Sequence, residues 1–298
     1  MNFLISPFSQ NEFMRLALFA GVLVACACAV AGTFVVLRGL AFVGDALSHG
    51  VLPGIATALL LGVSGVIGAA VGAALMMAGV NVVTRRLRLS GDTSVGLLFV
   101  GMLALGVMIT SRSKSFTGDL TRILFGELLG VRWSQLAWQA AAFVFVGAVA
   151  WACRRPFLLL CVDEGLTESS GFSVKRYHAI MLGLVAVTVV ASFQTVGTLL
   201  VLGMLIAPSA TGALISRRLS TMMLVAAISG SAATYIGLLI SYHADLAAGA
   251  SIVLSAVVIF AVVATTREVR TSLNRRHRSG HDDDHDAELP HQHAHLHI

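Results

Sequence analysis

Long apolar runs dominate this sequence, and each run is long enough to cross a lipid bilayer as a helix. A membrane-spanning helix needs about 20 mostly apolar residues. The runs lie at 13–37, 39–62, 65–83, 92–111, 133–153, 178–197, 198–216, 222–242 and 246–266. The junction near 197 is weak, because Gly197 and Pro208 permit a broken or re-entrant segment there. The pattern predicts an all-α, polytopic transmembrane bundle of eight or nine spans within residues 1–266.

The charged residues are too few for a water-soluble domain of this length. Only 12% of the 298 residues are charged and 57% are hydrophobic, whereas about a quarter of an ordinary soluble domain is charged. The net charge of +5 does not indicate a nucleic-acid partner, because the basic residues lie in short clusters between the apolar runs. Such clusters set the orientation of membrane proteins. We therefore expect a multi-pass protein of the plasma membrane, in contact with lipid.

The distribution of Lys and Arg predicts the orientation. With the N-terminus outside and nine spans, fifteen Lys and Arg residues lie on the cytoplasmic side and five lie outside. This positive-inside bias predicts a cytoplasmic C-terminus and a cytoplasmic loop at 154–177. The segment 112–132 mixes charged and apolar residues, and is expected to form a short interfacial helix at the outer surface.

Two ionisable residues lie inside the second apolar run. Asp45 and His49 are four residues apart, so a helix places both side chains on one face, with their Cβ atoms about 5–6 Å apart. An ionisable residue at this depth is costly and usually faces a partner, a cavity or a substrate. A carboxylate and an imidazole together suit zinc or manganese better than calcium or copper(I). The pair predicts a metal site, with a structural hydrogen bond as the alternative.

Other polar residues are weaker candidates for this site. Two ligands do not complete a metal site, so further ligands would have to come from another helix or from water. Ser48 is interpreted as a hydroxyl that packs between helices. His243 and Asp245, at the end of a late span, form the only comparable pair. They are interpreted as polar groups of a loop.

The residues around Asp45 and His49 carry a family resemblance. The segment 38–54, RGLAFVGDALSHGVLPG, resembles the signature of the ABC-3 family of metal-importer permeases. The segments 92–96, 124–126 and 195–208 are similar to later landmarks of the same family. The resemblance extends over roughly residues 13–266.

The resemblance implies a function and a set of partners. In that family, the aspartate and histidine that match Asp45 and His49 are implicated in contacting the metal in the translocation path. The family also implies a homodimer that works with a cytoplasmic ABC ATPase and receives metal from an extracytoplasmic metal-binding protein. We therefore expect the permease of an ATP-driven importer of a divalent transition metal, zinc or manganese, with no permanently bound cofactor.

The energy for transport must come from a partner, because the sequence contains no G-x-x-x-x-G-K-[ST] phosphate loop. The chain is thus not expected to be an enzyme. In the loop 154–177, the stretch 162–172 begins with acidic residues and has Gly171 where a helix would end. The resemblance places an ATPase-coupling helix here, although Thr167 and Ser169 stand where alanine is usual. A plain solvated loop is the alternative. The predicted coupling residues are Asp163, Glu164, Leu166, Gly171 and Phe172.

The last segment, 267–298, has a different composition. It is rich in His and Asp and poor in apolar residues, so it is predicted to be a disordered cytoplasmic tail. A His-rich tract is typical of metal binding. The candidate ligands are His281, His285, His291, His293, His295 and His297. The tail is interpreted either as a metal buffer or sensor, or as a solubilising extension.

Two other functions compete with a permease. A secondary metal transporter driven by an ion gradient would need more acidic residues at depth, and apart from Asp45 the spans have almost none. An intramembrane metalloprotease would need an H-E-x-x-H motif, which the sequence lacks. Of the two, the secondary transporter is the stronger alternative.

Overall fold

A computed structural model describes residues 7–8, 11–87, 91–111, 126 and 128–286. Throughout this part of the chain all regular secondary structure is helical. The chain divides into two compact units, residues 1–260 and residues 261–298.

The long helices follow the apolar runs of the sequence. The elements are α2 (Glu12–Leu37), α3 (Ala41–Gly50), α4 (Leu52–Leu60), α5 (Gly65–Leu87), α6 (Gly91–Thr110), η1 (Leu128–Gly130), α8 (Trp133–Ala152), α9 (Arg154–Val162), α10 (Glu164–Ser169), α11 (Val174–Ile215), α12 (Leu219–Ala244) and α13 (Ala248–Asp286). Within the described residues, nine segments are long and apolar enough to cross a membrane. Nine is the upper of the two predicted span numbers.

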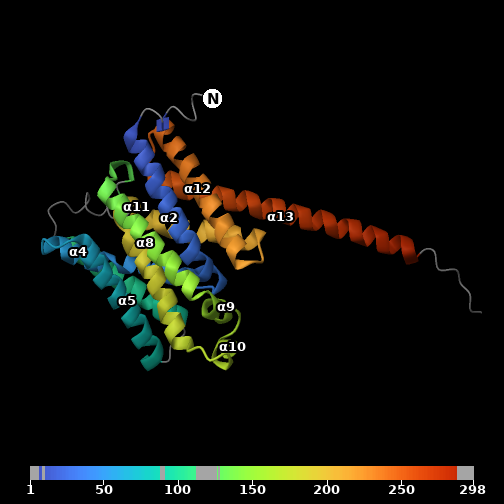
Figure 1. Ribbon diagram of the computed structural model, residues 1–298, viewed down its shortest axis with the longest axis horizontal. Helices are drawn as coiled ribbons and strands as arrows, with labels where there is room; N and C mark the ends of the chain where they lie inside the picture. Colours follow the sequence, from blue (N-terminus) through green and yellow to red (C-terminus); the bar gives the residue numbers. More distant parts are fainter. Residues whose placement is uncertain (1–6, 9–10, 88–90, 112–125, 127, 287–298) are drawn as a thin grey trace, which may run out of the picture. The chain divides into compact units, whose positions relative to one another are not determined.

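Helix α2 is the central helix of the first unit. It contacts α8, α11 and α12 (Figure 1). Much of its buried side is made of small residues, among them Ala25, Ala29 and Gly32. A Cβ atom added to Gly32 would collide with the carbonyl oxygen of Leu205 in α11. Small residues therefore let the two backbones approach, as is usual between membrane helices.

The second span is interrupted. The sequence predicted one run from 39 to 62, whereas the structure has two helices, α3 and α4, that meet at Val51. Pro53 lies in the first turn of α4. Proline has no N–H to donate to the carbonyl four residues earlier, so a continuous helix loses a hydrogen bond at this point.

The break near 197 was predicted and is confirmed. Helix α11 extends across this position, but Gly197 has φ 74° and ψ 164°, a conformation that is open almost only to glycine. Gly126 packs directly on this break, because a Cβ atom added to Gly126 would collide with the backbone nitrogen of Gly197. The predicted interfacial helix at 112–132 falls largely outside the described residues, and its described part contains η1 (Leu128–Gly130).

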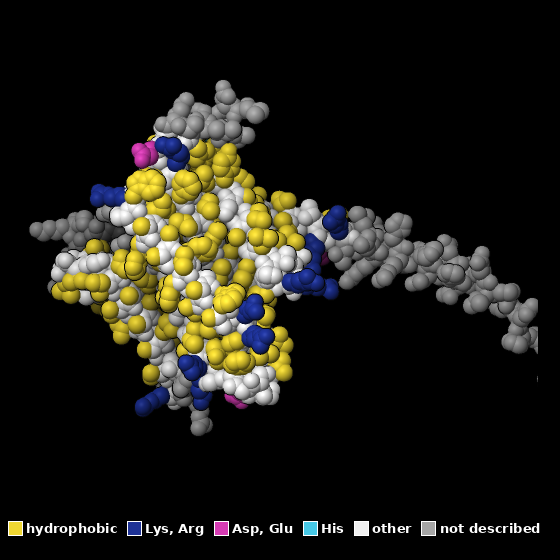
Figure 2. Space-filling model, viewed as in Figure 1, with side chains coloured by type: hydrophobic (Ala, Val, Ile, Leu, Met, Phe, Trp, Pro, Cys, Tyr) yellow, Lys and Arg dark blue, Asp and Glu magenta, His cyan; other side chains and the backbone are white. Residues whose placement is uncertain are grey.

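The surface of the first unit suits a lipid environment. Figure 2 shows hydrophobic side chains over the face turned to the viewer, with Lys and Arg toward its margins. Helices α6 and α8 are buried along only 22% and 17% of their spans, respectively. Their apolar surfaces would be unfavourable in water and are compatible with lipid or with another membrane protein.

The second unit begins inside α13. A disordered tail was predicted from residue 267, but the helix continues to Asp286. The stretch 267–286 contains no proline and a single glycine, Gly280, so no strong helix breaker interrupts it. The side chains of the predicted metal-binding histidines lie outside the described part of the chain.

Candidate functional site

Asp45 and His49 lie on one face of α3, as their spacing predicted. Asp45 Oδ1 is 3.5 Å from His49 Nε2. The side chains are 30% and 20% exposed, respectively, so both can be reached from outside the protein interior. A neutral N–H···O hydrogen bond normally measures about 2.7–3.2 Å. The observed distance is longer than that range, so the carboxylate and the imidazole form at most a weak hydrogen bond with each other.

The same distance is compatible with a shared cation. Zinc binds histidine nitrogen and carboxylate oxygen at about 2.0–2.2 Å. If Asp45 Oδ1 and His49 Nε2, 3.5 Å apart, each bonded one cation at about 2.1 Å, the angle at the cation would be roughly 110°. That angle is close to tetrahedral, so the two atoms could bind one metal without a change of the helix.

The surroundings of His49 leave part of its imidazole unsatisfied. Its Nδ1 is buried and has no hydrogen-bond partner among the described residues. The ring meets Phe99 of α6 edge to face, with a centroid distance of 5.5 Å. The buried Ser48 hydroxyl instead donates to the Gly44 carbonyl at 2.9 Å. Ser48 is thus occupied within its own helix, in agreement with its interpretation as a packing residue.

The described residues of one copy offer two ligands at this place, Asp45 and His49. Within the described residues there is no group of three or more His, Cys, Asp and Glu side chains close enough to hold a metal. His243 and Asp245 do not form such a group either; Asp245 caps the end of α12 with φ 51°. A metal at Asp45 and His49 would need water or a second protein chain to complete its coordination.

The predicted cytoplasmic loop 154–177 contains two short helices, α9 and α10, and the predicted coupling stretch 162–172 corresponds to α10 and its flanking residues. Asp163 caps α10, because its Oδ1 accepts a hydrogen bond from the backbone N–H of Leu166 at 2.8 Å. Gly171, with φ 83°, ends the helix as predicted. The N–H of Gly171 donates to Glu168 and the N–H of Phe172 donates to Thr167, which is the hydrogen-bond pattern of a Schellman motif.

The predicted coupling residues differ in exposure. Asp163, Glu164, Leu166 and Gly171 are exposed, so an acidic and partly apolar surface is available to a partner. Phe172 is half-buried against Tyr177, with ring centroids 5.5 Å apart. The four exposed residues therefore lie on the surface of the α10 segment, whereas Phe172 packs inward and anchors the turn that follows α10.

Sequence reasoning missed a polar contact made by Arg38. Its guanidinium donates to the Leu160 carbonyl at 2.9 Å and to Glu164 Oε1 at 2.8 Å. It also lies 3.5 Å from Nδ1 of His178. The partners are more than 100 residues away in the sequence, and no local pattern signals such a contact. The one signal in the sequence was the position of this charged residue, shortly before the helix α3 that contains Asp45.

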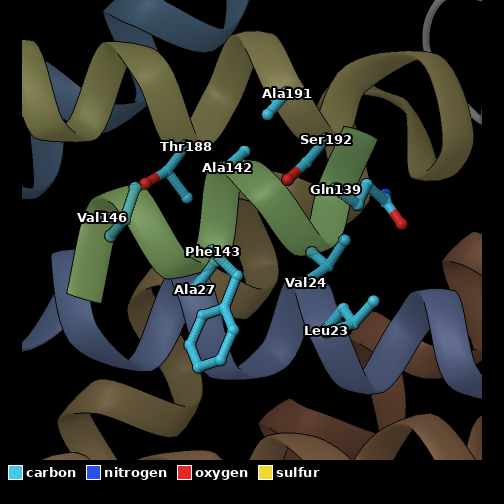
Figure 3. A pocket seen from close by; sticks show the side chains of 10 residues that line it. All are labelled: Leu23, Val24, Ala27, Gln139, Ala142, Phe143, Val146, Thr188, Ala191 and Ser192. Carbon is cyan, nitrogen blue, oxygen red and sulfur yellow. The ribbon is translucent and has the colours of Figure 1, made fainter. Parts of the chain in front are cut away.

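A second polar cluster, around Gln139 of α8, was also missed. The buried Gln139 amide donates to Thr195 of α11, and its Oε1 has no partner among the described residues. A cavity of about 10 Å³ lies beside it between α2, α8 and α11, and its lining includes Thr188 and Ser192 of α11 and Val24 of α2 (Figure 3). This volume is near the lower limit for one water molecule, so the cavity does not suit a larger substrate.

Comparison with known proteins identifies relatives over most of the chain. The ABC 3 transport family matches residues 10–267. The manganese transport system membrane protein MntC of Listeria monocytogenes is 38% identical over 251 residues, which cover 84% of this chain and 89% of the relative. The chelated iron transport system membrane protein YfeD of Yersinia pestis is 35% identical over 279 residues, or 93% of this chain and 94% of the relative.

A solved structure supports the same similarity. PsaBC from Streptococcus pneumoniae, in complex with Fab, has a chain that superimposes with a TM-score of 0.79 at 32% identity. The match covers 87% of this chain and 94% of the other. The helical arrangement described above is therefore shared with that protein.

Proposed function

The chain belongs to the ABC 3 transport family, and from this premise we propose that it is the membrane-spanning permease subunit of an ATP-driven importer of a divalent transition metal. The observation that carries the proposal is the Asp45–His49 pair. It presents one carboxylate oxygen and one imidazole nitrogen 3.5 Å apart on a partly exposed helix face inside a membrane span. The metal is the substrate, and the pair would contact it during passage.

Manganese is the first expected substrate. One relative is named for manganese transport and another for chelated iron, and a mixed oxygen and nitrogen site suits manganese, iron and zinc alike. Zinc, which the Asp and His pair also fits, is the metal to compare with manganese. The two ligands of one copy favour a homodimer, because a second copy would be the simplest source of further ligands.

ATP hydrolysis would be supplied by a separate cytoplasmic ABC ATPase. The chain itself has no phosphate-loop motif. The exposed surface of Asp163, Glu164 and Leu166 on α10 is the expected contact for that partner. An extracytoplasmic metal-binding protein would deliver the metal on the opposite side. This arrangement requires an outer N-terminus and a cytoplasmic C-terminus, the orientation that the Lys and Arg distribution favours.

The tail is proposed to hold metal ions on the cytoplasmic side. The segment 267–298 contains His residues interleaved with Asp, and imidazole binds zinc, copper, nickel and iron. Such a segment would act as a buffer or sensor of the imported metal. Deletion of the residues after Asp286 should then leave transport in proteoliposomes intact.

The test is uptake of radioactive manganese and, separately, zinc into proteoliposomes that contain this chain with its cognate ATPase and binding protein. Asp45→Ala and His49→Ala are compared with the wild type. We expect uptake to require ATP and to fall at least tenfold in both variants, because loss of a metal ligand removes a large part of the binding energy. Assembly with the ATPase should be unchanged, since both side chains are partly exposed.

Two outcomes would contradict the proposal. Metal uptake without ATP would favour a transporter driven by an ion gradient. ATP-dependent uptake that neither substitution affects would retain the permease but leave Asp45 and His49 as a structural pair.

A further inference from the structure

We propose that Arg38 is a positioning residue that links α9 and α10, of which α10 carries the expected ATPase contact, to α3, the helix that carries Asp45 and His49. Arg38 lies in the turn between α2 and α3, and its guanidinium bonds to α9 and α10. The inference rests on the proposed function, because it assigns a route by which the movement of a cytoplasmic partner reaches the metal pair.

Arg38 bonds to two elements and lies close to a third. One terminal nitrogen, Nη1, donates to the Leu160 carbonyl of α9 at 2.9 Å. The other, Nη2, donates to Glu164 Oε1 at the start of α10 at 2.8 Å and lies 3.5 Å from His178 Nδ1 of α11. Because a guanidinium has no acceptor atom, the contact with His178 requires that Nδ1 accepts.

The contact is largely buried on the Arg38 side. Its side chain is 16% exposed, whereas that of Glu164 is 59% exposed. An ion pair with one exposed partner contributes little to stability. The role we assign to Arg38 is therefore to position helices and not to stabilise the fold. Its planar guanidinium can bond two separate elements at once, and a lysine ammonium cannot reproduce that geometry.

Apolar packing holds the same elements together next to Arg38. The rings of Phe34 in α2 and Phe157 in α9 meet edge to face, with centroids 4.9 Å apart. Both side chains are fully buried, as is that of Leu160. Helix α9 is thus fixed to the end of α2 by packing, and Arg38 extends this attachment to α10.

The turn between Arg38 and α3 is closed by backbone hydrogen bonds. The N–H of Leu40 donates to Val35 at 2.8 Å and the N–H of Gly39 donates to Val36 at 3.1 Å. Gly39 has φ 66°, the left-handed conformation that this type of helix end requires. Helix α3 begins directly afterwards at Ala41.

A short, bonded path therefore runs from the α9–α10 segment to the metal pair. Asp45 follows the first residue of α3 by a single helical turn. The hydrogen-bonded turn between Arg38 and α3 has little freedom to absorb a displacement of Arg38, so a movement of α10 would be passed to α3. Without Arg38, the packing of Phe34 and Phe157 would still hold α9, but α10 would lose its bond to this turn.

The experiment uses the assembled transporter in proteoliposomes, with the cognate ATPase and binding protein, and measures manganese uptake and ATP hydrolysis together. The variants are Arg38→Gln, Arg38→Lys and Glu164→Gln. Arg155→Gln is the matched control, because Arg155 is an exposed arginine of the same α9 segment. The metal concentration is varied to separate the apparent KM from the maximal uptake rate.

We expect Arg38→Gln to lower the metal imported per ATP hydrolysed at least tenfold, while the apparent KM for manganese changes by less than about threefold. Arg38→Lys should restore only part of the ratio, because it can keep one of the two bonds. Glu164→Gln should have a smaller effect than Arg38→Gln, since the bond from Arg38 to Leu160 persists. Arg155→Gln should match the wild type.

A wild-type ratio of metal to ATP in Arg38→Gln would overturn the inference. So would a loss that appears wholly in KM, because that result would place the effect at the metal pair itself. If Arg38→Gln does not assemble, Arg38→Lys decides: a full wild-type ratio in that variant would show that the fork is not needed. Absence of ATP-dependent uptake in the wild type would instead contradict the proposed function.

Discussion

The Asp45–His49 pair and the Gln139–Thr195 pair both lie in described spans, and they differ in charge and in exposure. Asp45 and His49 are ionisable, partly exposed and poorly satisfied by each other. Gln139 and Thr195 are uncharged and almost fully buried at the contact of α8 with α11. The ionisable pair is thus partly exposed, whereas the buried contact between helices relies on a neutral amide.

This difference predicts that charge will be tolerated at one cluster and not at the other. Gln139→Glu would place a carboxylate at a site that is 4% exposed. An ionised acid at the centre of a membrane helix costs roughly 2.5–3.5 kcal/mol on insertion scales. We expect a fall of several degrees in the midpoint of thermal unfolding, measured on the purified protein in detergent.

Two variants serve as controls for that measurement. Gln139→Leu removes only the hydrogen bond to Thr195, and interhelical hydrogen bonds in membranes contribute about 0.6 kcal/mol on average. Asp45→Asn removes a charge from the partly exposed pair and should leave the midpoint close to that of the wild type. Equal midpoints for Gln139→Glu and Gln139→Leu would contradict the proposed difference between the clusters.

The helix break at Gly197, two residues beyond Thr195, is the next test of this region. Gly197→Ala forces a side chain into a conformation with φ 74°, which costs on the order of 1–3 kcal/mol. The matched control is Gly183→Ala in the same α11. A Cβ atom there meets no neighbour within 4 Å, and alanine favours a helix by up to about 1 kcal/mol over glycine.

Thermal unfolding in detergent again provides the measurement. We expect the midpoint of Gly197→Ala to fall and that of Gly183→Ala to stay level or rise. If both variants shift in the same direction by the same amount, the break at Gly197 does not depend on the backbone freedom of glycine.

The sequence predicted those features that depend on local spacing. The length of the apolar runs was sufficient for all nine spans found in the described residues, and Gly197 marked the break in α11. The i, i+4 spacing of Asp45 and His49 placed them on one face, since a helix repeats every 3.6 residues. The metal role assigned to this pair stays a prediction.

Features that depend on tertiary packing could not be predicted in this way. The interruption at Val51 was missed because a proline such as Pro53 can also lie inside a single membrane-spanning helix, so its presence did not indicate two helices. The bond from Arg38 to Glu164 joins residues 126 positions apart. The bond from Gln139 to Thr195 joins two different spans. Neither contact follows from periodicity or from the positions of helix ends.

The cysteine of α9 allows a smaller effect to be measured at Arg38. Cys161 follows Leu160 directly, the residue whose carbonyl accepts a hydrogen bond from Arg38. Burial raises the pKa of the Cys161 thiol above its usual value, and the positive charge of Arg38 opposes that rise. The thiolate is the form that reacts with alkylating reagents. The rate of alkylation therefore reports on the charge beside Cys161.

Arg38→Gln should slow alkylation of Cys161 by a few fold at pH 8, because loss of the positive charge lets the thiol pKa rise further and lowers the thiolate fraction. Iodoacetamide labelling of the assembled transporter, followed by mass spectrometry of the peptide that contains Cys161, gives the rate. Arg155→Gln is again the control and should react like the wild type. An accelerated reaction in Arg38→Gln would mean that α9 has lost its burial, and hence that Arg38 is needed to keep α9 packed. That result would contradict the conclusion that Phe34 and Phe157 suffice to hold this helix.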